Sequence, residues 1–146
     1  MDQVSPAIRE LATILLKIEA CESEETDDNA QALMLIVEKF RVHLSKLMGV
    51  SGFQALLARA LALARAEAGW LASVRVAPDA KLTGFHESAQ QELPNVATDG
   101  SILLLARLLG LLFTFIGVAL TLRLVQDIWP DAKIENWHSG NKETLA

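Results

Sequence analysis

Hydrophobic residues in the first half of the chain recur at every third or fourth position, with charged residues between them. This is the spacing of one face of an α-helix. It predicts amphipathic helices over about 6–20, 29–48 and 52–69. Each of these helices has one apolar face that needs a covering surface, so we expect them to pack together.

Polar and glycine residues mark the ends of these helices. Ser5 followed by Pro6 is typical of a helix start. Gly49 suits a left-handed cap at the end of the second helix, and Ser51 suits the N-cap of the third. We expect Gly69 to end the third helix.

The helical spacing stops after these helices. Val74 and Val76 alternate with polar residues, and Pro78 is typical of a turn. A short β-hairpin is therefore expected near 73–85.

A polar stretch connects this hairpin to the rest of the chain. Residues 86–93 are expected to form a short helix that Pro94 stops. A loop over 95–100 should follow, with Asp99 as the N-cap of the next helix.

The chain from Ser101 to Leu122 is apolar in every direction when wound as a helix, and Arg107 is its one charge. It predicts a long helix over about 100–128, stopped by Pro130. Such a helix must be enclosed by its own chain, by a second copy or by lipid.

These patterns predict an all-α fold. We expect a compact bundle of about four main helices around a long apolar C-terminal helix (about 100–128), with a short β-hairpin insertion near 73–85. A chain of 146 residues fits one domain, 1–146, with 131–146 as a partly flexible tail.

Five residues of the apolar stretch that are not Leu, Ile, Val, Phe or Ala draw one narrow stripe along the long helix: Arg107, Gly110, Thr114, Gly117 and Thr121. In a water-soluble bundle this stripe is the least buried edge of the helix. It is also a candidate contact seam between two copies, because glycines let backbones approach closely. In a membrane protein with one span at about 101–122 it is a packing face, although Arg107 opposes insertion. We favour the soluble bundle, which is compatible with a homo-oligomer.

Charge and cysteine content limit the partners and the compartment. The formal net charge of −5 argues against nucleic acid as a partner. A single cysteine forms no intramolecular disulfide, which is consistent with a reducing compartment and a cytoplasmic protein. Hydrophobic residues near the N-terminus recur at helical spacing, whereas a signal peptide has an uninterrupted hydrophobic run.

No pattern of reactive side chains indicates a catalytic, cofactor or metal site. The histidines at 43, 86 and 138 lack metal-ligand spacing. Cys21 lies among acids, which raise rather than lower the pKa of a thiol. The acidic run over 19–28 lacks the order of a calcium-binding loop and is expected to be a solvated segment.

Arginines and tryptophans are the other candidates. Arg59, Arg65, Arg107 and Arg123 lie on largely apolar helices, and we expect them at the rim of the core rather than in an anion site or an intersubunit ion-pair set. Trp129 is expected to close one end of the core. Trp137 is a candidate interface residue, together with the stripe.

Two stretches, GFQALLARALALARAEAGWL and LLLARLLGLLFTFIGVALTLRLVQDIWP, carry a family resemblance. The chain resembles, over roughly residues 40–135, a set of small uncharacterised bacterial helical proteins with no known activity. The resemblance implies a bacterial, stand-alone helical protein and assigns no functional residue.

The sequence therefore favours a non-enzymatic, protein-binding helical module, an adaptor or accessory subunit that self-associates. The alternatives are a small single-span membrane protein and an enzyme whose site is assembled from dispersed residues.

Overall fold

The structure is a computed structural model that describes residues 5–22 and 29–130, and everything below concerns these residues. The fold is all-α, as expected. Its elements, in chain order, are α1 (Pro6–Glu22), α2 (Asn29–Glu67), the 3₁₀ helix η1 (Gly69–Ser73), β1 (Arg75–Val76), β2 (Leu82–Thr83), α3 (Phe85–Gln90), α4 (Pro94–Phe115) and α5 (Val118–Ile128).

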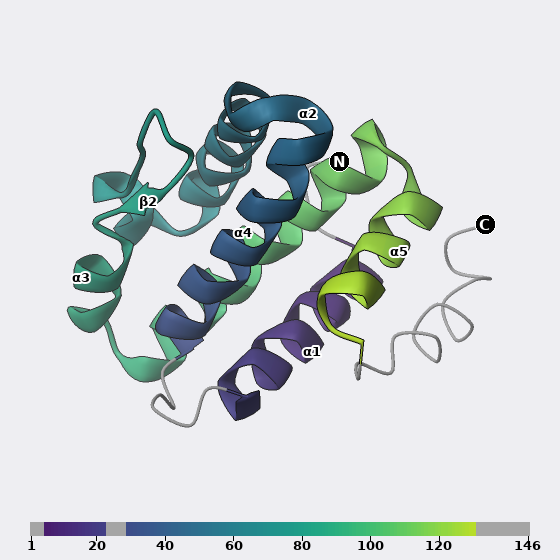
Figure 1. Ribbon diagram of the computed structural model, residues 1–146. Helices are drawn as coiled ribbons and strands as arrows, with labels where there is room; N and C mark the ends of the chain where they lie inside the picture. The colour runs from purple at the N-terminus through teal and green to yellow at the C-terminus, as the bar shows by residue number, and fades with distance from the viewer. Residues whose placement is uncertain (1–4, 23–28, 131–146) are drawn as a thin grey trace.

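Helix α4 is the centre of the bundle (Figure 1). It packs against each of the other four α-helices of the described residues. Its side chains make up much of the core: buried on α4 are Ala97, Gly100, Ser101, Leu103, Leu104, Leu105, Ala106, Leu108, Leu109 and Leu112. The expectation that amphipathic helices enclose the apolar helix is confirmed for this part of the chain.

Helix α2 bends at Gly49, where φ is 79° and ψ is 159°. The positive φ was expected, but the extended ψ is not that of a left-handed cap. Gly49 is the one residue inside α2 with non-helical backbone angles, so the second arm of the helix starts directly after it rather than at Ser51. The arm ends at Glu67, and Gly69 begins η1 instead of ending the helix.

The prediction of one continuous helix over 100–128 is wrong at its start and at a break inside the apolar stretch. Helix α4 starts at Pro94, so the expected loop over 95–100 is helical and Asp99 is not its N-cap. Proline suits a first helical position because no intrahelical partner exists there for an N–H group. The helix ends at Phe115, and Gly117, with φ of 92° and ψ of 157°, separates it from α5.

The hairpin prediction is confirmed. Strands β1 and β2 pair antiparallel, with Arg75 opposite Thr83 and Val76 opposite Leu82. Arg65 fixes this excursion to α2, because its Nη2 donates a hydrogen bond to the Val74 carbonyl oxygen at 2.8 Å. The short helix expected over 86–93 is α3, which ends three residues earlier, at Gln90.

Trp129 closes the core where α5 ends, as expected, and is only 1% exposed. Its Nε1 donates a hydrogen bond to Glu19 Oε1 at 3.0 Å, and Lys39 Nζ lies 2.7 Å from the same oxygen. The Phe40 ring meets the indole edge-on, with centroids 5.6 Å apart. Glu19 therefore belongs to a buried polar cluster of α1, α2 and the end of α5, not to a solvated acidic segment; residues 23–28 of that segment lie outside the described part.

We predict that Gly117→Ala lowers the free energy of unfolding by about 1–3 kcal/mol, because its φ and ψ fall in a region that is essentially restricted to glycine. Gly110→Ala is the matched control. Gly110 lies inside α4, and a Cβ there would meet only Ile8 Cδ1, at 4.0 Å. Alanine at that position should be neutral or should stabilise by up to about 1 kcal/mol. Urea denaturation of both variants tests this, and equal effects would contradict the backbone assignment.

Candidate functional site

Two hollows lie along α4, where α1 and the second arm of α2 leave part of its surface uncovered. The larger, which we call the Trp70 cleft, has a volume of about 420 Å³ and is lined by Arg9, Glu67, Ala68, Gly69, Trp70, Val96, Asp99, Gly100 and Leu103. The smaller, the Gly110 hollow, has a volume of about 250 Å³ and is lined by Ser5, Ile8, Leu63, Ala106, Arg107, Gly110 and Leu111.

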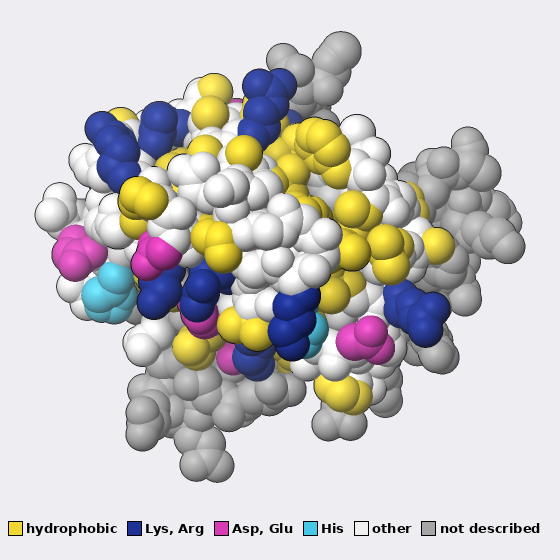
Figure 2. All heavy atoms as spheres, turned by 45° about the horizontal axis from the view of Figure 1, so that its top comes forward, with side chains coloured by type: hydrophobic (Ala, Val, Ile, Leu, Met, Phe, Trp, Pro, Cys, Tyr) yellow, Lys and Arg dark blue, Asp and Glu magenta, His cyan; other side chains and the backbone are white. Residues whose placement is uncertain are grey.

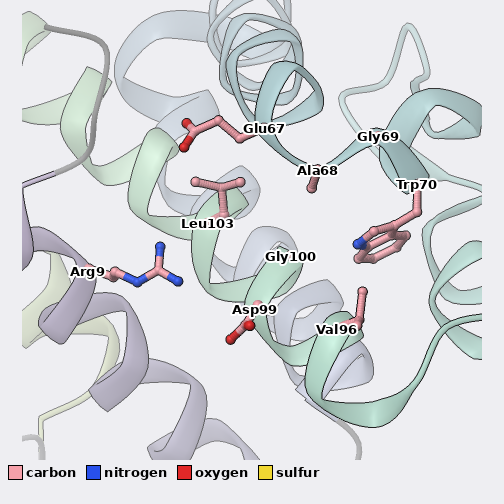
Figure 3. Close-up of a pocket in the computed structure, with 9 residues that line it drawn as sticks. All are labelled: Arg9, Glu67, Ala68, Gly69, Trp70, Val96, Asp99, Gly100 and Leu103. Carbon is pink, nitrogen blue, oxygen red and sulfur yellow. The ribbon is translucent and has the colours of Figure 1, made fainter.

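The Trp70 cleft has a charged side and an apolar side (Figure 3). Arg9 of α1 and Asp99 of α4 lie on one side of the exposed α4 surface, and Trp70 of η1 and Val96 lie on the other. The lining contains no histidine, cysteine or lysine among the described residues. Its charged groups are the guanidinium of Arg9 and the carboxylates of Glu67 and Asp99.

Gly100 brings the tryptophan into the wall of the cleft. A Cβ at this position would lie 2.3 Å from Trp70 Cζ2, so the indole rests directly on the backbone of α4. Phe85 supports the indole from α3, with ring centroids 5.6 Å apart and planes inclined by 45°. The cleft wall thus depends on a residue without a side chain.

Of the charged residues that line the two hollows, two form an ion pair with each other and two do not. Glu67, at the rim of the Trp70 cleft, pairs with Arg107, whose side chain is mostly buried. This pair joins α2 to α4 within one chain. Arg9 and Asp99 are exposed, and neither forms an ion pair with another described residue.

Two buried donors beside the hollows lack acceptors within the described residues: Trp70 Nε1 and Arg107 Nε. A buried donor without a partner costs about 1–3 kcal/mol, so native proteins contain few of them. One of these donors belongs to the lining of the Trp70 cleft and the other to the lining of the Gly110 hollow.

No family model, curated protein or solved structure matches this chain. The resemblance to small bacterial helical proteins therefore stays a prediction.

The predicted stripe does not stay on one face. Arg107 and Gly110 line the Gly110 hollow, and Thr114 is exposed one turn further along α4. Beyond the Gly117 break, Thr121 is buried and its hydroxyl donates a hydrogen bond to the Gly117 carbonyl oxygen at 2.7 Å. The α4 part of the stripe is thus an uncovered edge, whereas its last member is in the core. Trp137 lies outside the described residues.

The histidines of the described residues have local partners. His43 Nδ1 lies 2.9 Å from the Lys39 carbonyl oxygen, and His86 Nε2 lies 3.0 Å from Gln90 Nε2. No group of three or more metal-ligating side chains occurs among the described residues. His138 lies outside them, and Cys21 is exposed with a free thiol.

A perturbed carboxylate lies away from both hollows. A hydrogen bond from Arg41 holds the pKa of Glu38 below its usual value, against a smaller opposing effect of burial. The two residues are one turn apart on α2, with Arg41 Nη2 2.5 Å from Glu38 Oε2. This is an ordinary helix-surface pair and suggests no chemistry.

Sequence reasoning missed the Trp70 cleft. Arg9 and Asp99 lie on helices far apart in the chain, and each looks like an ordinary surface residue. The one usable signal was Gly100, a glycine inside an apolar helix, which often marks a close approach of another group.

We predict that Gly100→Ala lowers the free energy of unfolding by about 1–3 kcal/mol, as overpacking does elsewhere. The same substitution in a Trp70→Leu background should cost much less, because the clashing indole is gone. A double-mutant cycle by urea denaturation measures the difference. Equal costs in both backgrounds would show that Trp70 does not rest on Gly100.

Proposed function

We propose that this chain is a non-enzymatic, protein-binding helical module that associates with a second copy of itself. The observation that supports this most is a set of large hydrophobic side chains left exposed at one end of the bundle. They are Leu47 and Val50, beside the bend of α2, and Phe115 and Leu120, on either side of the α4–α5 break. We call these four residues the apolar end.

Both glycine breaks lie toward the same end of the bundle, at the top of Figure 1. Viewed with this end forward, hydrophobic side chains gather over part of the surface (Figure 2). Leu47 is 58% exposed, although its helical position predicts a core residue, and Phe115 is 69% exposed. Clustered exposure of large apolar residues is typical of interaction surfaces.

A second copy fits this surface because neither of its two segments carries charge. Residues 47–58 and 108–122 contain no Asp, Glu, Lys or Arg. A two-fold interface places the same patch on both partners, so two such surfaces meet without burying an unpaired charge. The net charge of −5 opposes association through the rest of the surface.

Sedimentation equilibrium tests this proposal with Phe115→Glu. The residue is exposed, so the fold should tolerate the change, while a glutamate in the centre of a dimer should weaken it by at least about 30-fold, as loss of an interface hot spot does. Leu93→Glu is the matched control, because Leu93 is 68% exposed but precedes α4 at the other end of the bundle. A monomeric wild-type protein at micromolar concentration, or equal weakening by both variants, would overturn the proposal.

The second candidate is a small membrane protein with a span at about 101–122. The observation that favours it is that two helices of the described residues, Ala30–Glu67 and Pro94–Phe115, are long and apolar enough to cross a bilayer. Against it, 56% of the apolar window of α4 is buried by the rest of the protein, as in the core helix of a soluble bundle. Cell fractionation separates the two candidates: recovery in the soluble fraction without detergent excludes the span and agrees with a cytoplasmic module.

A further inference from the structure

The charged side of the Trp70 cleft has one free positive and one free negative group. Arg107 neutralises Glu67, which leaves the guanidinium of Arg9 and the carboxylate of Asp99 to face the cleft. A purely anionic ligand would meet Asp99, and a purely cationic ligand would meet Arg9. A ligand that carries both charges satisfies both side chains.

The opposite side of the cleft takes an apolar group. The indole of Trp70 and the side chain of Val96 form this wall, and Leu103 and the bare backbone of Gly100 lie between it and the charged side (Figure 3). The volume of about 420 Å³ lies in the range of small-molecule sites, and it exceeds what a charged head group alone would fill.

We propose that the Trp70 cleft binds a free α-amino acid with a bulky apolar side chain. The carboxylate pairs with Arg9, the ammonium group pairs with Asp99, and the side chain crosses Gly100 and Leu103 to pack against Trp70. This site lies on a different part of the bundle from the apolar end, so the proposal does not rest on self-association.

The indole of Trp70 provides a way to detect the bound ligand. Its N–H group is buried at the edge of the cleft without an acceptor. An apolar ligand side chain packed against the indole changes the surroundings of this N–H. The indole N–H is therefore a spectroscopic reporter of the bound state.

The first experiment is calorimetric titration of the full-length protein with L-phenylalanine, N-acetyl-L-phenylalanine, L-phenylalaninamide and glycine. We expect L-phenylalanine to bind, and each blocked analogue to bind about 10- to 100-fold more weakly, since each loses one charge-assisted pairing. Glycine should bind more weakly because it lacks the apolar group. If the amide or the acetylated form binds as well as the free amino acid, the site takes a peptide terminus and the proposal is overturned.

The second experiment uses variants that leave the core untouched. Arg9→Met and Asp99→Asn replace exposed residues, and each should weaken binding of L-phenylalanine by about 10- to 100-fold. Arg59→Met is the control, because Arg59 is exposed on α2 and does not line the cleft. In the wild type, the Trp70 indole N–H resonance, assigned with Trp70→Phe, should shift on saturation with L-phenylalanine.

Two results would overturn the proposal. One is the absence of any heat or resonance shift with L-phenylalanine up to about 10 mM, beyond which affinity is too weak for a specific small-molecule site. The other is equal binding by the wild type and by both Arg9→Met and Asp99→Asn. A self-association defect has no effect on either readout, so failure here is distinguishable from failure of the proposed function.

Discussion

Replacing Trp129 with alanine is expected to lower the free energy of unfolding by about 3–5 kcal/mol, the usual cost of removing a buried tryptophan. The side chain is almost completely buried, and it packs edge-on against Phe40 of α2. It is also the residue that ties the end of α5 to the first two helices. The substitution therefore leaves a cavity and removes the hydrogen bond to Glu19.

Trp129→Phe separates packing from hydrogen bonding at this position. Phenylalanine keeps most of the apolar contact but cannot donate to Glu19, whose carboxylate then keeps only Lys39 among its described partners. We expect this variant to lose about 1–2 kcal/mol, the range for a hydrogen bond to a charged acceptor. Urea denaturation monitored by far-ultraviolet circular dichroism gives both values. Losses below about 1 kcal/mol for both variants would show that the end of α5 is not docked as described.

Helical periodicity was sufficient to predict the amphipathic helices. In α1 and in both arms of α2, apolar residues recur at every third or fourth position with polar residues between them, so the spacing identifies the buried face. Gly49 was also recognisable, because a glycine between two periodic segments indicates a break. The expected left-handed conformation of Gly49 was wrong in ψ, because a glycine in the sequence indicates a positive φ but does not determine ψ.

The apolar stretch could not be divided in the same way. Where every position is hydrophobic, the spacing contains no information about the buried face, and Gly117 had the same appearance as Gly110. One glycine ends a helix and the other lies inside it. Tertiary packing decides which glycine breaks the helix. At Gly117 the chain turns, so that Thr121 and Val125 of α5 are buried and Trp129 reaches Glu19.

The polar features were the least predictable from sequence. Glu19 belongs to a run of acids and looks like a solvent-exposed residue, yet it is only 4% exposed because Lys39 and Trp129 are brought to it by two other helices. The Trp70 cleft has the same origin, since it combines groups from α1, α2, η1 and α4. Such convergence depends on the packing of whole helices and leaves no local pattern.

Leu108→Ala is expected to destabilise the protein by about 2–5 kcal/mol, because Leu108 is fully buried in the middle of α4 and the helices around it can collapse only partly onto the cavity. Leu93→Ala is the matched control, a strongly exposed leucine just before the same helix, and should change stability by no more than about 0.5 kcal/mol. Both are measured by urea denaturation in buffer without detergent.

This comparison tests whether protein or lipid covers α4. In a bundle dissolved in water, the difference between the two leucines follows from their burial alone. If α4 lay in a bilayer, the isolated protein would require detergent, and acyl chains would fill much of the space left at Leu108. A cooperative transition without detergent and a large difference between the variants are therefore expected together. A small effect of Leu108→Ala would mean that the α1 and α2 helices do not enclose α4.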